Sequence, residues 1–359
     1  MRYLEFCEAL GLTPVDSVRK IYEEAEDLLQ PPDITWVSRL MPQAGEEVLE
    51  GAREIAGDPL KLRYVNLLKL CYWVLPEEEQ PFLEPEPGNV MKNVGPLLVL
   101  LSFVDRAEQE MCRRGIPEDI RSRVHKVYEG VFLSTKRIFG YPAVRFAHYT
   151  WVKHNLTPDL FAFGSLEFEM CSFPREGTFF RNKNTGALVG FWEEDETPEA
   201  YVCREILRGG ALGEPRSLSK TDYECFLRPG EDTLSVHIPG GARVDRAACE
   251  AAFAEAREFF ARHFPERKPK CFYCRSWLMD PSLADHLAEK SNIVFFQRQF
   301  QRCPVKSSGK EVFFFVHPKP FERYEELPEN TSLERMLKTR YLAGDPVYAY
   351  AGLCPFEDQ

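Results

Sequence analysis

The sequence lacks the features that mark secreted, membrane-spanning and disordered proteins. Its longest apolar run, residues 97–104, is far too short for a transmembrane helix, which needs about 20 apolar residues. Charged residues occur within the first five positions, which argues against a secretion signal. Low-complexity blocks and fixed-period repeats are missing, and 44% of the 359 residues are apolar. We therefore expect a globular protein with no membrane span and no secretion signal.

Cysteine spacing gives no sign of a disulfide framework. The 11 cysteines are an odd number, and a chain of this length does not need disulfide bonds, so we expect reduced thiols and a cytoplasmic protein. Cys271 and Cys274 have the spacing of half a zinc site. Their segment has the pattern of a strand, however, in which residues three apart point to opposite faces, and no second pair follows at zinc-finger spacing. We expect buried structural cysteines and no metal.

Positive charge is also scarce. The chain has 45 Lys and Arg residues against 56 Asp and Glu residues, which gives a formal net charge of −11 at pH 7. Such a surface repels a phosphate backbone unless its basic residues gather on one face. We expect no nucleic-acid partner, and no oligomeric state is predicted.

The length favours two domains, because single hydrophobic cores usually stop growing beyond about 250 residues. Helical patterns fill the first part of the chain, and the character changes near residues 140–142, Gly-Tyr-Pro. We therefore predict an α+β chain, with an all-helical N-terminal domain over residues 1–145 and a mixed α/β domain over residues 146–359.

Apolar periodicity, caps and proline breaks define the helices expected in the first domain. The first has Thr13 as its cap and Pro14 as its first helical residue, and it stops at Pro31-Pro32. The others cover residues 45–56, 59–73, 90–115 and 117–139.

Strand patterns begin after residue 146. An Asn-Thr-Gly turn at residues 184–186 separates two apolar runs and predicts one hairpin. Pro229-Gly230 predicts a second hairpin between residues 223–227 and 234–238. The sheet is therefore expected to be at least partly antiparallel.

The last third of the chain alternates helices and strands. Asp245 is the expected N-cap of a helix whose apolar face carries Cys249, Phe253, Ala256 and Phe260. The elements expected after it are a strand at 271–279, helices at 282–289 and 291–300, a strand at 311–317, a helix at 332–342 and a strand at 346–353.

Between Thr233 and His317, the order strand, glycine turn, helix, strand, helix, strand resembles the central part of GNAT acyltransferases. More closely, the segments VHIPGGARVDRAACE, CRSWLMDPSL and SNIVFFQRQF resemble the GNAT-like C-terminal domain of bacterial acyltransferase-domain proteins. Those proteins also carry a helical N-terminal domain, so the resemblance covers most of the chain. It implies acyl-CoA as co-substrate.

The resemblance also implies where acyl-CoA binds. In GNAT enzymes the fourth and fifth strands splay apart, and the pantetheine arm binds the backbone of the fourth, which here is residues 234–238. The pyrophosphate lies on the glycine turn and the following helix N-terminus, where free amides favour anions. The implied contacts are Val236, Ile238, Gly240, Gly241, Arg243 and Arg246.

Two features of this turn depart from the family pattern. The usual Gln or Arg followed by Gly-x-Gly or Gly-x-Ala is absent, and Asp245 would oppose an anion that came close. A plain tight turn is weighed equally with a phosphate cradle.

The segment SNIVFFQRQF parallels a GNAT helix whose tyrosine often protonates the departing thiolate. Phe296 stands at that position and has no hydroxyl, so unless Tyr273, Ser276 or a water takes the role, the thiolate must leave unassisted or the site is not catalytic. The resemblance places Ser276 and Trp277 near the thioester or the acceptor, although tryptophan is more often a core residue. Asn292 is a further ligand candidate that could equally cap its helix.

A base is required as well, because acyl transfer to an amine needs a neutral nucleophile. His237 lies between Val236 and Ile238 in a strand, so its side chain projects from the opposite face, and a histidine titrates near neutral pH. Glu167 alternates with Leu166 and Phe168 on another strand. A structural histidine and a solvated glutamate are the alternatives.

These observations favour a CoA-dependent acyltransferase that moves an acyl group directly to an amine or hydroxyl acceptor, a small molecule or a peptide. A catalytically inactive GNAT-like module that binds CoA or another small ligand is the alternative, favoured by Phe296 and the missing glycine signature. A structural protein whose helical half docks a partner is a third.

Overall fold

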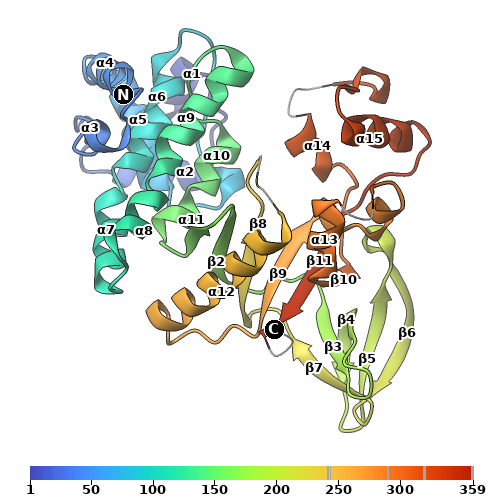
Figure 1. The fold of residues 1–359 in the computed structure, drawn as a ribbon. Coiled ribbons are helices and arrows are strands. Elements are labelled where there is room, and N and C mark those ends of the chain that lie inside the picture. Colours follow the sequence, from blue (N-terminus) through green and yellow to red (C-terminus); the bar gives the residue numbers. More distant parts are fainter. Residues whose placement is uncertain (241, 243, 289–290, 318–320, 357–359) are drawn as a thin grey trace. The chain divides into compact units, whose positions relative to one another are not determined.

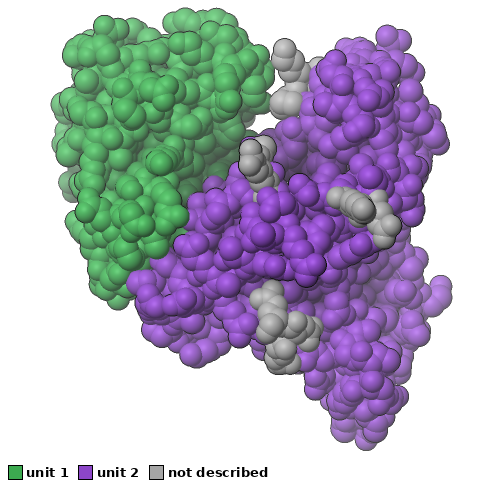
Figure 2. Space-filling model, viewed as in Figure 1, with its two compact units in different colours: residues 1–161 green, residues 162–359 purple. Residues whose placement is uncertain are grey.

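The computed structural model describes residues 1–240, 242, 244–288, 291–317 and 321–356. The chain divides into two compact units, Met1–Phe161 and Ala162–Gln359 (Figures 1 and 2). This division falls later than the boundary predicted after residue 145.

The first unit is built from helices, as the sequence predicts. Its elements are α1 (Tyr3–Leu10), α2 (Asp16–Glu24), α3 (Val37–Leu40), α4 (Gly45–Ala56), α5 (Pro59–Cys71), the 3-10 helix η1 (Glu77–Glu79), α6 (Val90–Leu101), α7 (Val104–Arg113), α8 (Glu118–Val124), α9 (Lys126–Phe139), α10 (Phe146–Trp151) and α11 (Lys153–Leu156).

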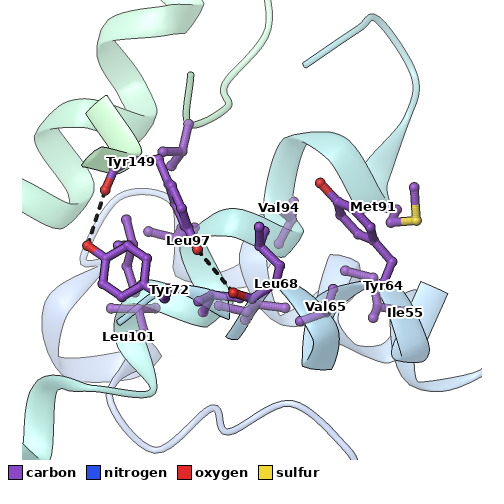
Figure 3. Packing of buried hydrophobic residues seen from close by; sticks show 14 of the residues in the cluster. Ile55, Tyr64, Val65, Leu68, Tyr72, Met91, Val94, Leu97, Leu101 and Tyr149 are labelled. Carbon is purple, nitrogen blue, oxygen red and sulfur yellow. Dashed lines mark hydrogen bonds between the residues drawn. The ribbon is translucent and has the colours of Figure 1, made fainter. Parts of the chain in front are cut away.

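Helix α6 is the centre of this unit, because it is buried on nearly all sides and packs against α4 and α5. Close packing is possible because Gly95 of α6 lies where an added Cβ would come within 3.0 Å of the Val65 side chain. Figure 3 shows the surrounding core, where Tyr72 donates a hydrogen bond to the Tyr149 carbonyl and Tyr149 donates to the Leu68 carbonyl.

Several helix boundaries differ from the prediction. The first of the predicted helices ends at Glu24, before the expected stop at Pro31-Pro32, and α5 ends at Cys71 instead of residue 73. Helix α2 starts at Asp16, because the Tyr3 hydroxyl bonds the backbone of Val15 and holds it extended. The predicted helix 117–139 is divided into α8 and α9 at His125, whose Nε2 lies 2.6 Å from Glu108 Oε1. The predicted helix 90–115 is likewise divided into α6 and α7 by a turn at residues 102–103.

The second unit combines two sheets with helices. The division between the units falls within its first strand, β1 (Leu160–Phe163). The elements that follow are β2 (Leu166–Ser172), β3 (Thr178–Asn182), β4 (Leu188–Glu196), β5 (Ala200–Ile206), η2 (Arg208–Gly210), β6 (Leu212–Ser219), β7 (Tyr223–Leu227), β8 (Asp232–His237), α12 (Arg246–His263), β9 (Cys271–Ser276), η3 (Trp277–Met279), η4 (Pro281–Asp285), α13 (Asn292–Arg298), β10 (Gln301–Pro304), α14 (Glu311–Val316), η5 (Tyr324–Glu326), α15 (Ser332–Leu342) and β11 (Tyr350–Pro355).

The six-stranded sheet has the order β1-β2-β8-β9-β11-β10, and the five-stranded sheet has the order β6-β5-β4-β3-β7 (Figure 1). In the larger sheet β8 and β9 form a parallel pair, while β2–β8, β9–β11 and β10–β11 are antiparallel. The partly antiparallel sheet predicted from the sequence is therefore confirmed.

The two faces of the larger sheet are covered differently. Helix α12 packs on one face, where Phe253 stacks on Phe272 at 4.7 Å between ring centroids and also contacts Phe168. The other face packs at β9 against the five-stranded sheet, through a buried cluster that contains Tyr273 and Phe179. The predicted Asp245 cap and apolar face of α12 are confirmed.

The predicted second hairpin is wrong. Gly230 does make the expected turn, with φ +91°, but β7 pairs with β3 while β8 pairs with β2. The reason lies beyond the turn, where the Phe173 amide donates to the Glu231 carbonyl and the Gly230 amide donates to the Phe173 carbonyl. These bonds extend the β2–β8 pairing, so residues 174–229 form an insertion between two adjacent strands.

The predicted strand at residues 311–317 is also wrong, because this segment forms α14. Glu311 accepts hydrogen bonds from the amides of Ser308 and Lys310, which fixes a helical start. Val312 and Phe313 are buried against α15, whose predicted bounds are confirmed.

Two further elements are shorter than expected. The strand predicted to residue 279 ends at Ser276, and η4 replaces the first part of the predicted helix 282–289. Residue 289 lies outside the described residues. In the described part of the chain, no helix has the length and apolar character needed to cross a membrane.

Candidate active site

The candidate site lies where the pairing between β8 and β9 stops. The last register pair of these parallel strands is Ser235 with Tyr273, whereas β8 runs on to His237 and β9 runs on to Ser276. Beyond that pair, the facing edges form no ladder among the described residues. Strand edges of this kind can present backbone N–H and C=O groups to a ligand that contains amides.

The outer neighbours keep both strand ends in place. On β2, Glu167 is the register partner of His237, and on β11, Tyr350 is the partner of Ser276. The ends of β8 and β9 are therefore fixed from outside, although in the described part of the chain their own register pairs stop at Ser235 and Tyr273.

Three titratable side chains share one face at the end of β8. Because Glu167 pairs with His237, and Glu169 lies two residues along the same strand, all three project from the face opposite α12. His237 Nε2 lies 3.0 Å from Glu169 Oε2, with side-chain exposures of 26% and 12%. The structure therefore brings together the two predicted base candidates and adds Glu169.

Burial shapes the electrostatics of this group. Burial raises the pKa of the Glu167 carboxyl, and the charge of His237 opposes that rise. A carboxyl whose pKa is raised toward neutrality can exchange a proton more readily than an ordinary glutamate.

Glu169 was missed by the sequence analysis, although one signal for it was present. Glu167 and Glu169 are separated by a single residue in a strand pattern, so both face the same side of the sheet. The missing information was the β2–β8 pairing, which brings Glu169 opposite Ser235 and next to His237.

Ser276 and Trp277 lie at the end of β9. The Ser276 hydroxyl accepts a hydrogen bond from the Leu278 amide at 3.1 Å and caps η3. Trp277 is buried in a cluster with Leu283 and Tyr341. Both positions therefore have a structural role, and neither contact excludes a ligand near the serine.

Of the two backbone positions expected to hold pantetheine, one lies within the β2–β8 ladder and the other lies beyond it. Val236 is paired with Phe168 and its buried side chain points to the α12 side of the sheet. Ile238 follows the end of β8 and is half-buried.

The turn after β8 is open at Gly240, where an added Cβ would meet no atom within 4 Å. The Ala242 amide donates to the Pro239 carbonyl at 3.0 Å. The expected ligands Gly241 and Arg243 lie outside the described residues.

At the start of α12, a carboxylate already occupies the helix N-terminus. Asp245 accepts from the Ala248 amide at 3.1 Å, and its charge disfavours an anion there. Arg246 is exposed, donates to Glu250 at 2.8 Å and lies over the Phe295 ring. Its guanidinium is the described positive charge nearest in sequence to the turn.

Helix α13 packs by apolar contacts. Ser291 caps it by accepting from the Val294 amide, so the candidate Asn292 is its first residue and is exposed. Phe296 is buried and contacts Phe300, and Phe253 of α12 lies 6.4 Å away between ring centroids. The residue that departs from the GNAT pattern is therefore a core residue.

Tyr273, a candidate proton donor, is engaged elsewhere. Its hydroxyl donates to Glu176, which also forms an ion pair with Arg275, and burial raises the Tyr273 pKa well above its usual range. Cys271 and Cys274, one on each face of β9, are both buried. Among the described residues, no group of three or more His, Cys, Asp or Glu side chains could hold a metal ion.

Comparisons with known proteins agree with this architecture. The family model of the GNAT-like C-terminal domain matches residues 160–354. An acyltransferase crystallised with CoA and 10C-teicoplanin is similar in structure, with a TM-score of 0.71, 19% identity and 99% of each chain covered. The complex of an acyltransferase with decanoyl-CoA and teicoplanin gives a TM-score of 0.69 at the same identity and coverage. No curated protein matches.

A mutant acyltransferase in complex with octanoyl-CoA is similar as well, with a TM-score of 0.66, 18% identity and 99% of each chain covered. At these identities the likeness shows a shared fold over both units.

Proposed function

Because the chain belongs to the GNAT-like C-terminal domain family, we propose that it transfers an acyl group from acyl-CoA directly to an amine or hydroxyl acceptor. The observation that carries this proposal is the early end of the β8–β9 ladder at Ser235 and Tyr273, beside a histidine and two carboxyls. That place combines backbone groups for an amide-rich arm with side chains that can take a proton.

In the proposed complex, the pantetheine arm runs along the backbone of Val236 and Ile238. The pyrophosphate lies at the turn formed by Gly240 and Gly241, with charge supplied by Arg243 and Arg246. The similar solved structures support acyl-CoA as co-substrate, because they contain CoA, decanoyl-CoA and octanoyl-CoA.

The chemistry needs three groups. His237 removes a proton from the acceptor as the new bond to the acyl carbon forms, and Glu167 takes part in passing that proton onward. The carbon–sulfur bond then breaks, and the hydroxyl of Ser276 donates a hydrogen bond to the leaving thiolate at the place where Phe296 has no hydroxyl. The thiolate takes up the proton that the acceptor released. Trp277 and Asn292 complete the proposed surroundings of the thioester.

The acceptor is proposed to be a small molecule or a peptide with a reactive amine or hydroxyl. Two of the similar structures contain teicoplanin with decanoyl-CoA and 10C-teicoplanin with CoA, and these pairs support an acceptor of this kind. The reaction is placed in the cytoplasm, which fits the 11 cysteines that are all free thiols.

A second candidate function is a module that binds CoA without transferring an acyl group. Buried Phe296 favours it, because the position that often carries a catalytic tyrosine is instead part of the aromatic core.

Thermal shift with CoA, acetyl-CoA, octanoyl-CoA and decanoyl-CoA tests both candidates. A ligand at 100 times its dissociation constant stabilises the folded state by about 2.7 kcal/mol, which raises the Tm measurably. If none of the four ligands raises the Tm, both functions are excluded.

Turnover then separates the two candidates. Release of free CoA thiol from decanoyl-CoA, with mixed amine acceptors, should occur in the parent protein and fall by about 10²-fold or more in His237→Ala. The control is Glu255→Gln, on the exposed face of α12. Binding without turnover in the parent selects the CoA-binding module, and an unchanged rate in His237→Ala removes the base assignment.

A further inference from the structure

We propose that Glu169 is a positioning residue for His237, which holds the imidazole proton on Nε2 and so makes Nδ1 the atom that receives the acceptor's proton. The inference rests on the proposed function and adds to it a residue and a ring atom. It is carried by one contact, the 3.0 Å separation of His237 Nε2 and Glu169 Oε2.

Strand register makes the contact possible. Glu167 is the direct partner of His237, and Glu169 is the partner of Ser235, so Glu169 lies diagonally across the ladder on the same face. Diagonal positions are within reach of long side chains. The histidine ring thus leans along the sheet toward Glu169, whose side chain is only 12% exposed.

A carboxylate decides which ring nitrogen carries the proton. Neutral imidazole has one N–H donor and one acceptor nitrogen, whereas an ionised carboxylate only accepts. With Nε2–H donated to Glu169, the lone pair is on Nδ1. The same logic, with the two nitrogens exchanged, orients the histidine of serine hydrolase triads.

The proposed transfer step accounts for each proton and each electron pair. The Nδ1 lone pair takes the proton of the acceptor N–H or O–H as the acceptor atom bonds to the acyl carbon. The carbon–sulfur bond breaks, and its electron pair stays on sulfur as the thiolate. The negative charge of Glu169 stabilises the imidazolium until the proton is passed to the thiolate or to solvent.

Glu167 is less suited to this positioning role, although it is the direct strand partner. The contact with ring Nε2 is made by Glu169 Oε2, two residues along the same strand. The other titratable or charged groups on this face of β2, β8 and β9 are Cys171, Cys271, Tyr273 and Arg275. The Cys171 sulfur lies 3.5 Å from the Thr233 hydroxyl. Glu176 accepts a hydrogen bond from the Tyr273 hydroxyl and forms an ion pair with Arg275.

Two substitutions at Glu169 separate positioning from packing. Glu169→Gln keeps a carbonyl oxygen that can accept Nε2–H, whereas Glu169→Leu keeps the bulk and removes every acceptor. We expect kcat to fall by about tenfold in the first and by about 10²-fold or more in the second, with KM for acyl-CoA within about twofold of the parent. Glu255→Leu, on the exposed face of α12, is the control and should leave kcat unchanged.

The direct readout is the ¹⁵N NMR spectrum of the imidazole at a pH where the ring is neutral. The chain has seven histidines, so the His237 signals are assigned by their loss in His237→Gln. We expect the Nε2–H tautomer in the parent and in Glu169→Gln, and a shift toward Nδ1–H in Glu169→Leu.

An Nδ1–H tautomer in the parent would overturn the proposal, and so would parent-like kcat in Glu169→Leu. If Glu169→Leu does not fold, the parent tautomer and the response of Glu169→Gln decide the matter. Failure of the proposed function has a different signature, in which the parent neither binds nor turns over acyl-CoA while its ring tautomer still reports on Glu169.

Discussion

The carboxyl of Glu167 lies on a buried part of β2, where burial raises its pKa and the charge of His237 opposes the rise. A raised pKa in the folded state means that folding favours the protonated carboxyl. This stabilisation is complete below the pKa of the unfolded chain, about 4.3 for glutamate. It is lost as the pH rises through the folded-state pKa.

Glu167→Gln should remove that pH dependence while keeping the shape of the side chain. We expect the variant to match the parent in free energy of unfolding at the acid end of the range, and to become the more stable of the two as the pH rises through the folded-state pKa of Glu167. Urea denaturation between pH 4 and pH 8 measures the difference. Glu255→Gln is the exposed control, and a difference that does not vary with pH would contradict the expectation.

At the residue scale, the sequence could indicate candidate residues but not the side chains that each of them contacts. The alternating pattern was sufficient to propose Glu167 and His237, and the register pairs them. The contact of His237 with Glu169 depends on which strands are adjacent, which no single segment reveals. Ser276 was placed at a strand end, but its cap on η3 depends on a turn that the apolar pattern of residues 271–279 conceals.

Among elements, α12 illustrates how a helix N-terminus can be stable and yet unfavourable for an anion. Asp245 caps the helix by accepting from the Ala248 amide. The same carboxylate lies beside the turn that is proposed to receive the pyrophosphate, so one side chain stabilises the helix and repels the ligand.

Asp245→Ala and Asp245→Asn should separate those two effects. The alanine variant loses the cap, and we expect it to lose about 0.5–2 kcal/mol of stability. The asparagine variant keeps a capping oxygen and should stay close to the parent in stability. Both remove the negative charge, so both should bind CoA more tightly in isothermal titration. Unchanged or weaker CoA binding in both variants would show that the pyrophosphate does not lie near this helix end.

The elements best predicted were helices with clear ends. Residues 45–56 and 332–342 form α4 and α15 with the predicted bounds, the second with a capping box at Thr331 and Glu334. The EVFFFVH run was wrongly predicted as a strand, because a short continuous apolar run does not distinguish the two structures by periodicity. Its helical start depends on Glu311 binding two amides before it.

On the scale of the whole molecule, the helical unit has its own core. Leu68 on α5 is fully buried in it, while Leu70, two residues further along, is 44% exposed. The second unit buries separate clusters around β9 and α15. A loss of packing in the first unit should therefore leave the proposed CoA site of the second intact while both are folded.

Leu68→Ala should lower the free energy of unfolding by about 2–5 kcal/mol, because it leaves a cavity in the core. Leu70→Ala should change it by no more than about 0.5 kcal/mol. We expect both variants to bind CoA with the parent's affinity at a temperature well below the transition. Weakened CoA binding in Leu68→Ala alone would mean that the helical core supports the site.

The arrangement of strands into two sheets was the part of the fold that local patterns could not supply. The Pro229-Gly230 turn was recognised correctly, yet the strands on its two sides belong to different sheets. Turn chemistry fixes the local direction of the chain, whereas sheet membership depends on residues far away in the sequence, here Phe173 and its bonds to residues 230 and 231.

The hydrogen bonds between Phe173 and residues 230 and 231 bring both ends of the five-stranded addition to a single point. A segment whose two ends meet can be lengthened, shortened or exchanged during evolution without shifting the alignment of the strands from which it emerges. The distance between His237 and Glu169 therefore does not depend on the length of that segment. Relatives with additions of very different size could retain the same pair of side chains.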